Sequence, residues 1–213
     1  ADRRNSHTQK IGAAFGLEEF EPVFIAGSTQ DPEERIALET FLELRNEFPK
    51  LRLILVPRHK ERFEETARLV ESYGLPLLRR SAIDVENGIS NLARYDAKPI
   101  ILLDTLGELS ACWGLADFAY VGGSMSNRGG QNMMEPCAYG AAVCFGPNTR
   151  NFRDVVQPLL ERNAAKVVKD QLGLTSLLRA WLTDRQSATR QGIAAREFVL
   201  SQSGASQKTI DLL

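Results

Sequence analysis

The sequence lacks most of the short motifs that identify a metal site, a nucleotide site or a hydrolase active site. Only three cysteines and two histidines occur among its 213 residues, and their spacing matches no zinc site. The glycines form neither the GxGxxG fingerprint of dinucleotide-binding proteins nor the phosphate loop of NTPases. No serine lies in a GxSxG nucleophile elbow. These absences disfavour a histidine-based metal site, a standard dinucleotide site and a hydrolase triad.

The chain also has no excess of charge and no long hydrophobic run. Its 26 Lys and Arg nearly balance 27 Asp and Glu, which gives a formal net charge of −1. A balanced chain has no overall attraction for nucleic acid or an anionic membrane, so an anion site must be local. The apolar runs are too short to cross a bilayer, and the first residues have no signal-peptide core. We expect a soluble globular chain that binds no nucleic acid.

The cysteines and tryptophans are expected to be structural. Cys112, Cys137 and Cys144 are odd in number and each lies in an apolar stretch. They are therefore predicted to be small buried hydrophobic residues in a reducing compartment. Trp113 and Trp181 fall on predicted helices and are predicted to belong to the core.

Short apolar runs alternate with helical patterns along most of the chain. The runs predict strands at 23–26, 53–56, 75–78, 99–103, 118–121, 142–145 and 166–168. Helices are predicted from Asp31 to Phe48, from Phe63 to Gly74, over 106–115, 133–139 and 152–160, and from 172 onward. Asp31 is expected to cap the first of them. Continuous apolar strands are buried on both faces. The pattern predicts a Rossmann-like, doubly wound parallel α/β sheet, with the proline-containing run 75–78 at an edge.

The chain is predicted to form one domain with a lead-in. Residues 1–21 are polar, lack a clear period and are expected to be an interdomain lead-in or linker. No linker is evident within residues 22–213, although residues 81–97 have the composition of a mixed loop. We therefore expect a single folded unit over 22–213.

Small, polar and cationic residues follow most of the predicted strands. In such sheets ligands bind in the crevice beyond the carboxyl ends of the strands. The residues there that could bind a ligand are Ser28, Thr29, Arg58, His59, Gly107, Glu108, Gly123 and Ser124. Each also has a structural interpretation: a turn serine or threonine, a surface arginine, a capping histidine, or an ordinary helix acid.

The densest polar segment runs from Gly122 to Gly140. Its two glycine pairs, the second of which leads through Gln131 and Asn132 into a short helix, favour an anion site made of backbone N–H groups, suited to phosphate. The site residues expected here are Gly129, Gly130, Gln131 and Asn132, with Glu135 one turn into the helix. Glu135 could accept two ribose hydroxyls or could only complement the helix dipole. The alternative for the whole segment is a flexible exposed loop.

Six motifs in a fixed order resemble those of the 3-deoxy-D-manno-octulosonic acid (Kdo) transferases of lipopolysaccharide synthesis. They are Ser28-Thr29, Leu55 to Phe63, Asp104 to Leu109, Val121 to Ser124, Arg128 to Pro136, and Gly146 to Phe152. Each motif alone is weak evidence, but the resemblance covers nearly all of residues 22–213. It implies the C-terminal, donor-binding half of a GT-B glycosyltransferase.

The resemblance also implies the reaction and its participants. The donor would be CMP-Kdo and the acceptor a lipid A precursor, with inverting transfer that needs no metal and no cofactor. Arg58, Ser124 and the backbone from Gly129 to Asn132 would hold phosphate or the Kdo carboxylate, and Glu135 the ribose. The cytidine and sugar sites would be lined by Ser28, Thr29, His59, Gly107 and Glu108.

Two departures from the family pattern limit these expectations. The chain begins just before the first predicted strand, so we expect the N-terminal acceptor domain to be absent, with its glutamate base and membrane anchor. The parent enzyme would work at the cytoplasmic side of the bacterial inner membrane, whereas this chain would bind CMP without turnover. Gln131 also stands where many relatives have histidine. A GT-B relative that uses a UDP-sugar, or a non-catalytic binding module, remains an alternative.

Overall fold

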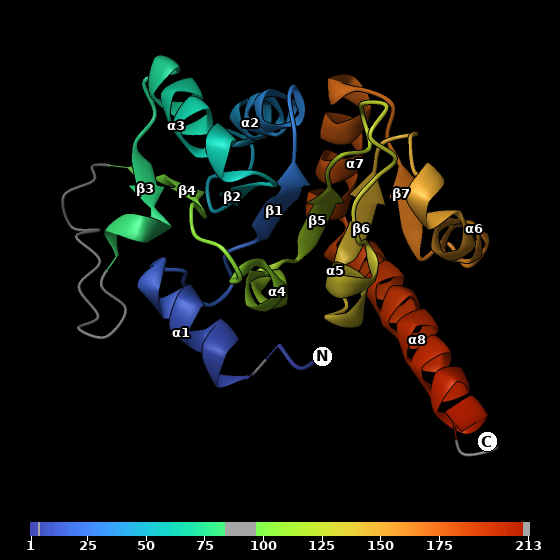
Figure 1. Cartoon of the computed structure of the whole chain (residues 1–213). Coiled ribbons are helices and arrows are strands. Elements are labelled where there is room, and N and C mark those ends of the chain that lie inside the picture. Colours follow the sequence, from blue (N-terminus) through green and yellow to red (C-terminus); the bar gives the residue numbers. More distant parts are fainter. Residues whose placement is uncertain (4, 84–96, 211–213) are drawn as a thin grey trace.

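The computed structural model describes residues 1–3, 5–83 and 97–210, which fold around one parallel β-sheet (Figure 1). The seven strands lie in the order β3-β4-β2-β1-β5-β6-β7, and every neighbouring pair is parallel. The predicted strands and the edge position of β3 are confirmed. The strands are β1 (Val23–Thr29), β2 (Arg52–Pro57), β3 (Leu77–Arg79), β4 (Ile100–Leu102), β5 (Phe118–Val121), β6 (Ala142–Phe145) and β7 (Ala165–Val167).

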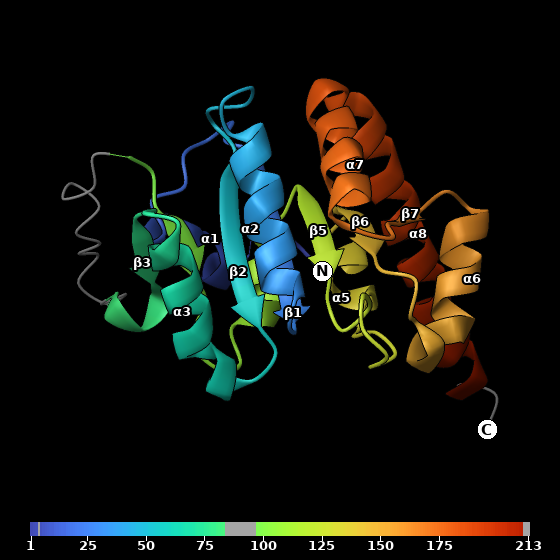
Figure 2. The ribbon, with the colours of Figure 1, turned by 90° about the horizontal axis from the view of Figure 1, so that it is seen from above.

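Helices cover both faces of the sheet. Figure 2 shows α2, α3 and α7 side by side over one face, while α1, α4, α5 and α8 lie on the other in Figure 1 and α6 lies beside the β7 edge. This arrangement is the predicted doubly wound α/β fold. The helices are α1 (Ser6–Ala14), α2 (Glu33–Leu44), α3 (Phe63–Ser72), α4 (Leu109–Cys112), α5 (Met134–Ala138), α6 (Arg153–Glu161), α7 (Gln171–Thr183) and α8 (Arg185–Ile210).

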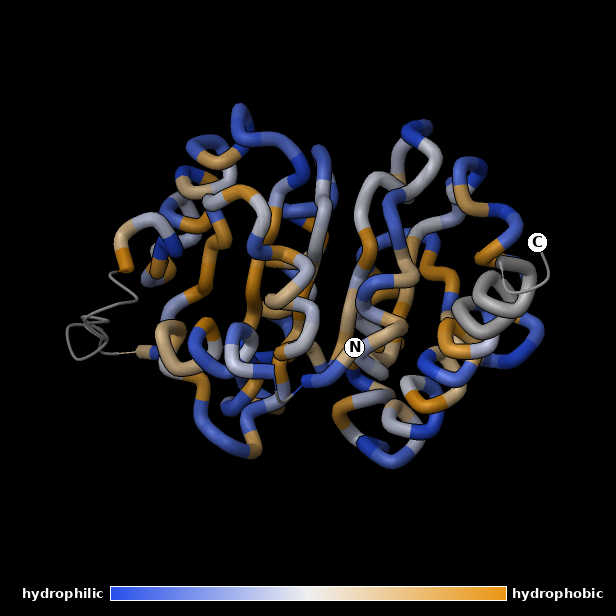
Figure 3. Tube along the Cα trace, turned by 60° about the horizontal axis from the view of Figure 1, so that its bottom comes forward, coloured by the Kyte–Doolittle hydropathy of each residue, from blue (hydrophilic) through white to orange (hydrophobic). Residues whose placement is uncertain are grey.

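The two faces of each central strand pack into different hydrophobic clusters. In β1, Phe24 lies in the cluster under α2 and α7, whereas its neighbour Ile25 lies in the cluster with α1 and α5. Leu53 and Ile54 of β2 divide in the same way. Because both sides of each strand are apolar, the strand sequences are continuous rather than alternating. Figure 3 shows these hydrophobic strands in the interior and hydrophilic segments along the outer loops.

Helix α1 was not predicted from the sequence. It lies within residues 1–21, and Ile11 and Phe15 are almost completely buried in the core. Thr8 donates its hydroxyl hydrogen bond to the Ala111 carbonyl at 2.9 Å, and Arg3 reaches the carbonyls of residues 114–116. The segment is therefore packed onto the domain, because its few apolar side chains meet α4. Its role as a link to another domain stays a prediction.

Other helix boundaries differ from the sequence-based expectation. Asp31 makes no capping hydrogen bond; α2 begins at Glu33, whose carboxylate accepts the Gln30 N–H instead. The helix expected over 106–115 begins at Leu109, and the C-terminal helical region divides at Asp184 into α7 and α8. Most of the loop expected over 81–97 lies outside the described residues. Within the described part of the chain, no helix has an apolar stretch long enough to cross a membrane.

Candidate functional site

A pocket of about 420 Å³ opens beyond the carboxyl ends of β1 and β2. We call it the rim pocket. It draws on four regions of the chain: the ends of two strands, the segment around α4, the loop that enters α5, and the start of α6. The residues that line it are Ser28, Arg58, Gly107, Leu109, Ser110, Trp113, Gln131, Asn132, Glu135 and Phe152. Six of the residues expected from the sequence thus share one cavity.

Arg58 supplies the positive charge of the rim pocket. It directly follows β2, and its backbone N–H donates to the Thr29 carbonyl at 2.9 Å, which fixes the start of the side chain. The side chain is exposed, and its guanidinium has no hydrogen bond or ion pair within the described residues. An arginine fork without a partner at a cavity wall can bind a phosphate or carboxylate through two parallel hydrogen bonds.

Ser28 lines the pocket from a constrained backbone position. Its φ of 54° lies in the left-handed region, which costs free energy for any residue other than glycine. A Cβ at Gly122 would lie only 2.5 Å from the Ser28 carbonyl oxygen, so the ends of β1 and β5 approach closely there. Strain of this kind is concentrated at functional sites. The close approach requires glycine at 122.

Asn132 and Glu135 form a linked pair at the entrance to α5. The Asn132 side-chain amide donates to the Glu135 carboxylate at 3.0 Å, and its Oδ1 accepts the Met134 N–H at 3.0 Å. Helix α5 has only five residues. Its first amide is already satisfied, so the strong helix-end anion site expected from the sequence is not present in this form. Glu135 nevertheless presents a positioned carboxylate to the pocket.

The backbone amides at the end of β5 are occupied by a side chain of the protein itself. The carboxylate of Glu33, fully buried, accepts the N–H groups of Gly123, Ser124 and Met125 at 2.7, 2.9 and 2.9 Å. It also accepts the Tyr120 hydroxyl at 2.8 Å. In this structure Glu33 therefore occupies the amides that the sequence pattern suggested for phosphate, and the predicted phosphate contacts of Gly123 and Ser124 stay a prediction that these hydrogen bonds do not favour. This role of Glu33 could not be predicted from the sequence, because an acid in the first turn of a helix is common.

The hydroxyls of Ser124 and Thr29 are buried structural groups. Ser124 Oγ donates to the Val121 carbonyl and accepts the Gly146 N–H, both at 2.7 Å. The Thr29 hydroxyl points to the Val56 carbonyl at 3.4 Å. Both residues are shielded from solvent, and neither is among the residues that line the rim pocket. Their predicted contact with a ligand stays a prediction.

Four further predicted residues lie outside the rim pocket. Glu108 pairs with Arg80 at 2.7 Å and accepts the Thr105 hydroxyl. His59 is exposed and precedes a 3₁₀ turn without capping it through its side chain. Gly130 donates its N–H to the Gly123 carbonyl at 2.8 Å, so that amide is not available to a ligand. Gly129 lines a different cavity.

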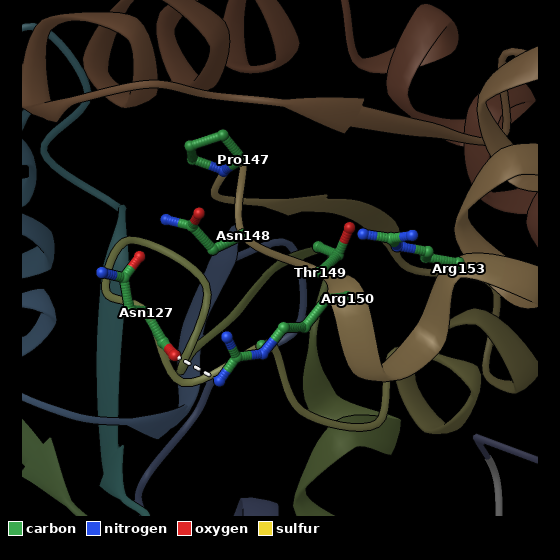
Figure 4. A pocket seen from close by; sticks show the side chains of 7 residues that line it. Asn127, Pro147, Asn148, Thr149, Arg150 and Arg153 are labelled. Carbon is green, nitrogen blue, oxygen red and sulfur yellow. Dashed lines mark hydrogen bonds between the residues drawn. The ribbon is translucent and has the colours of Figure 1, made fainter.

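That second cavity was not anticipated from the sequence. It encloses about 260 Å³ between the loop at Gly129 and the turn that follows β6 (Figure 4). We call it the arginine cavity because two arginines and no acid line it. Its lining residues are Asn127, Gly129, Pro147, Asn148, Thr149, Arg150 and Arg153. Phe152, between the two arginines, belongs to the rim pocket, so the two cavities are neighbours.

The cysteines and tryptophans are buried residues of the protein core. All three cysteines are free thiols and buried, as predicted, and burial raises the pKa of the Cys137 thiol to about 12. Trp113 and Trp181 are buried, also as predicted. Within the described residues no cluster of three His, Cys, Asp or Glu side chains is placed to hold a metal ion.

Comparison with known proteins places the chain in a family. No family model matches it. The 3-deoxy-D-manno-octulosonic acid transferase of Haemophilus influenzae is 35% identical over 193 residues, which cover 90% of this chain and 43% of that protein. The solved C-terminal CMP-Kdo binding domain of WaaA from Acinetobacter baumannii matches 91% of this chain and 95% of that domain, at 29% identity and a TM-score of 0.78. This chain belongs to the Kdo transferase family.

The matched region is only part of the relatives, and a further solved structure shows the same fold. This chain spans less than half the length of the curated relative from H. influenzae. The Anabaena protein Alr3699/HepE, solved with UDP and glucose, matches all of this chain and 54% of its own at 14% identity and a TM-score of 0.57. A likeness at that identity shows the fold alone. The sheet is the Rossmann-like domain of GT-B glycosyltransferases, as the sequence predicted.

Proposed function

We propose that this Kdo transferase chain binds the sugar nucleotide donor CMP-Kdo in the rim pocket. The observation that carries the proposal is the convergence of Ser28, Arg58, Gln131, Asn132 and Glu135 on one cavity at the carboxyl edge of the sheet. Ligands of doubly wound sheets bind at that edge. The matching domain of WaaA from A. baumannii is described as a CMP-Kdo binding domain, which supports the same ligand class here.

The lining residues suit the parts of a nucleotide. Arg58 is the one cationic side chain among the described lining residues, and we assign it to the phosphate. Glu135, held by the Asn132 amide at 3.0 Å, is assigned to the ribose hydroxyls, which donate hydrogen bonds to a carboxylate. Gln131 donates and accepts through its neutral amide. Ser28 completes the polar wall close to Arg58.

The proposed reaction is transfer of Kdo from CMP to a lipid A precursor. An acceptor hydroxyl attacks C2 of Kdo, the bond between C2 and the phosphate oxygen breaks, and CMP leaves with inversion at C2. Arg58 would stabilise the charge that develops on the departing phosphate. The proposal includes no metal and no cofactor, and it places the enzyme at the cytoplasmic side of the bacterial inner membrane.

We further propose that this chain alone binds the donor without transferring Kdo. The curated relative is more than twice as long as the region matched here, and we assign the general base and the acceptor site to the part that this chain does not cover. Affinity for CMP should be in the high micromolar range or weaker, because closed clefts bury more of a ligand than one wall does.

Isothermal calorimetry with CMP, UMP and UDP tests the donor class. The expected result is measurable heat with CMP and weaker binding of both uridine nucleotides under the same conditions. Preference for a uridine nucleotide would replace CMP-Kdo by a UDP-sugar as the donor. Transfer assays with CMP-Kdo and a lipid A precursor should give no product with this chain, and clear turnover would refute the assignment of the base elsewhere.

A further inference from the structure

The arginine cavity has an excess of positive charge and hydrogen-bond donors. Arg150 Nη2 donates a hydrogen bond to the Asn127 carbonyl at 2.9 Å. The other N–H groups of its guanidinium have no partner within the described residues. The Arg153 guanidinium has no hydrogen bond or ion pair there. Figure 4 shows both arginine side chains and the Thr149 hydroxyl around the same opening. Two arginines that line one cavity without an acid give that cavity a positive potential, which favours an anion.

The walls of the cavity are held in place by hydrogen bonds between its two segments. The Asn151 backbone N–H donates to the Gly129 carbonyl at 3.0 Å, and the Asn151 side-chain amide donates to the Arg128 carbonyl at 3.0 Å. A Cβ at Gly129 would lie 2.6 Å from the Asn151 amide nitrogen, so the loop packs against the turn with no room for a side chain. The cavity is therefore preformed, which reduces the entropy lost when a ligand binds.

We propose that the arginine cavity binds an oxyanion carried by a substrate, either a phosphate ester or a sugar carboxylate. Its volume of about 260 Å³ is below the range of pockets that enclose whole nucleotides, but it admits one charged group. Arg150 and Arg153 would bind the oxygens through charge-assisted hydrogen bonds, with Thr149 and Asn148 as neutral donors. Because the neighbouring rim pocket shares the turn around Phe152, one substrate could reach both cavities.

Titration with inorganic phosphate at constant ionic strength, followed by amide NMR, tests this site directly. Phosphate should shift the amides of residues 127–129 and 148–153 in a saturable manner, both without CMP and with CMP in excess. Arg150→Ala and Arg153→Ala should each weaken this binding about tenfold, the loss expected for one charge-assisted hydrogen bond. Arg45→Ala, an exposed arginine at the end of α2, should leave it unchanged.

The outcome separates this proposal from the donor assignment. Phosphate shifts confined to the rim pocket, or unchanged in both arginine variants, would overturn the oxyanion site even if CMP binds. Conversely, the site stands if phosphate titrates at residues 148–153 while CMP fails to bind. Competition by free Kdo would identify a donor carboxylate, and competition by a hexosamine phosphate would identify an acceptor phosphate.

Discussion

The Glu33 carboxylate lies 2.7 Å from the Gly123 backbone nitrogen and accepts its N–H. Together with the other amides at the end of β5, this contact ties the start of α2 to the loop that leads into the rim pocket. The glycine-rich loop therefore owes its shape to an internal anion. Glu33, which does not line the pocket, thus anchors residues 123–125 at the start of the loop that carries Gln131 and Asn132.

Replacing Glu33 by glutamine should destabilise the fold. Glutamine has one acceptor oxygen, and its amide group would face N–H donors that the carboxylate now satisfies. We expect a loss of about 2 kcal/mol or more in the free energy of unfolding, measured by urea denaturation. Weaker CMP binding should accompany it, because the loop into α5 loses its support.

Glu43→Gln is the matched control on the same helix. Glu43 is exposed and contacts Arg179 at 3.4 Å, and surface pairs of this kind contribute little. The free energy of unfolding of the Glu43→Gln variant should stay within about 0.5 kcal/mol of the wild-type value. If Glu33→Gln behaves like this control, the internal carboxylate does not hold the loop.

Ser124→Ala should reduce stability and leave CMP affinity unchanged. The substitution leaves the buried Gly146 N–H without its acceptor, which costs about 1–3 kcal/mol. Ser126→Ala is the comparison, since the buried Ser126 hydroxyl has no partner in the described structure and its removal should be neutral or stabilising. A large fall in CMP affinity at unchanged stability for Ser124→Ala would restore the serine as a ligand residue.

Arg58→Ala should weaken CMP binding about tenfold, the typical loss for a charge-assisted hydrogen bond to phosphate. Stability should be unaffected, because the exposed Arg58 side chain has no partner in the described residues. Arg45→Ala serves again as the control for nonspecific charge effects. Equal affinities for the two variants in calorimetry would remove Arg58 from the phosphate site.

Acid should destabilise the protein through Asp104. Burial alone would raise the pKa of this carboxyl, but hydrogen bonds from Ser81 and the pairing with Arg79 hold the pKa below its usual value. A lowered pKa in the folded state means that the stabilisation is fully present above the unfolded pKa of about 3.9 and is lost as pH falls from there through the lower folded pKa. The stability difference between wild type and Asp104→Asn should therefore shrink from pH 6 to pH 3, as measured by urea unfolding. A constant difference over that range would contradict the role of the ionised form.

The sequence predicted the sheet well because its strands are buried on both faces. Continuous apolar runs such as 53–56 and 142–145, alternating with helical patterns, are typical of buried parallel strands. Helix α1 was missed because its packing depends on partners far along the chain, as the Thr8 to Ala111 hydrogen bond illustrates. Tertiary packing decides such a weakly patterned segment.

The location of the candidate site could be predicted from the sequence, but the hydrogen-bond partners of its groups could not. Arg58, Ser28 and Glu135 were placed at one edge because strand ends in a parallel sheet share that edge. The occupants of the backbone amides could not be read from the sequence. Glu33, in an ordinary helix start, fills the ring that the Gly122–Ser124 pattern suggested for phosphate. The arginine cavity likewise depends on how two loops meet.

A crystal structure of this chain soaked with CMP would show directly whether the rim pocket binds the donor nucleotide. We expect nucleotide density in the rim pocket, with the phosphate at the Arg58 guanidinium and the ribose hydroxyls at the Glu135 carboxylate. The amides of Gly123 and Ser124 should remain bonded to Glu33. Density for CMP elsewhere, with the rim pocket empty, would contradict the assignment of this pocket to the donor.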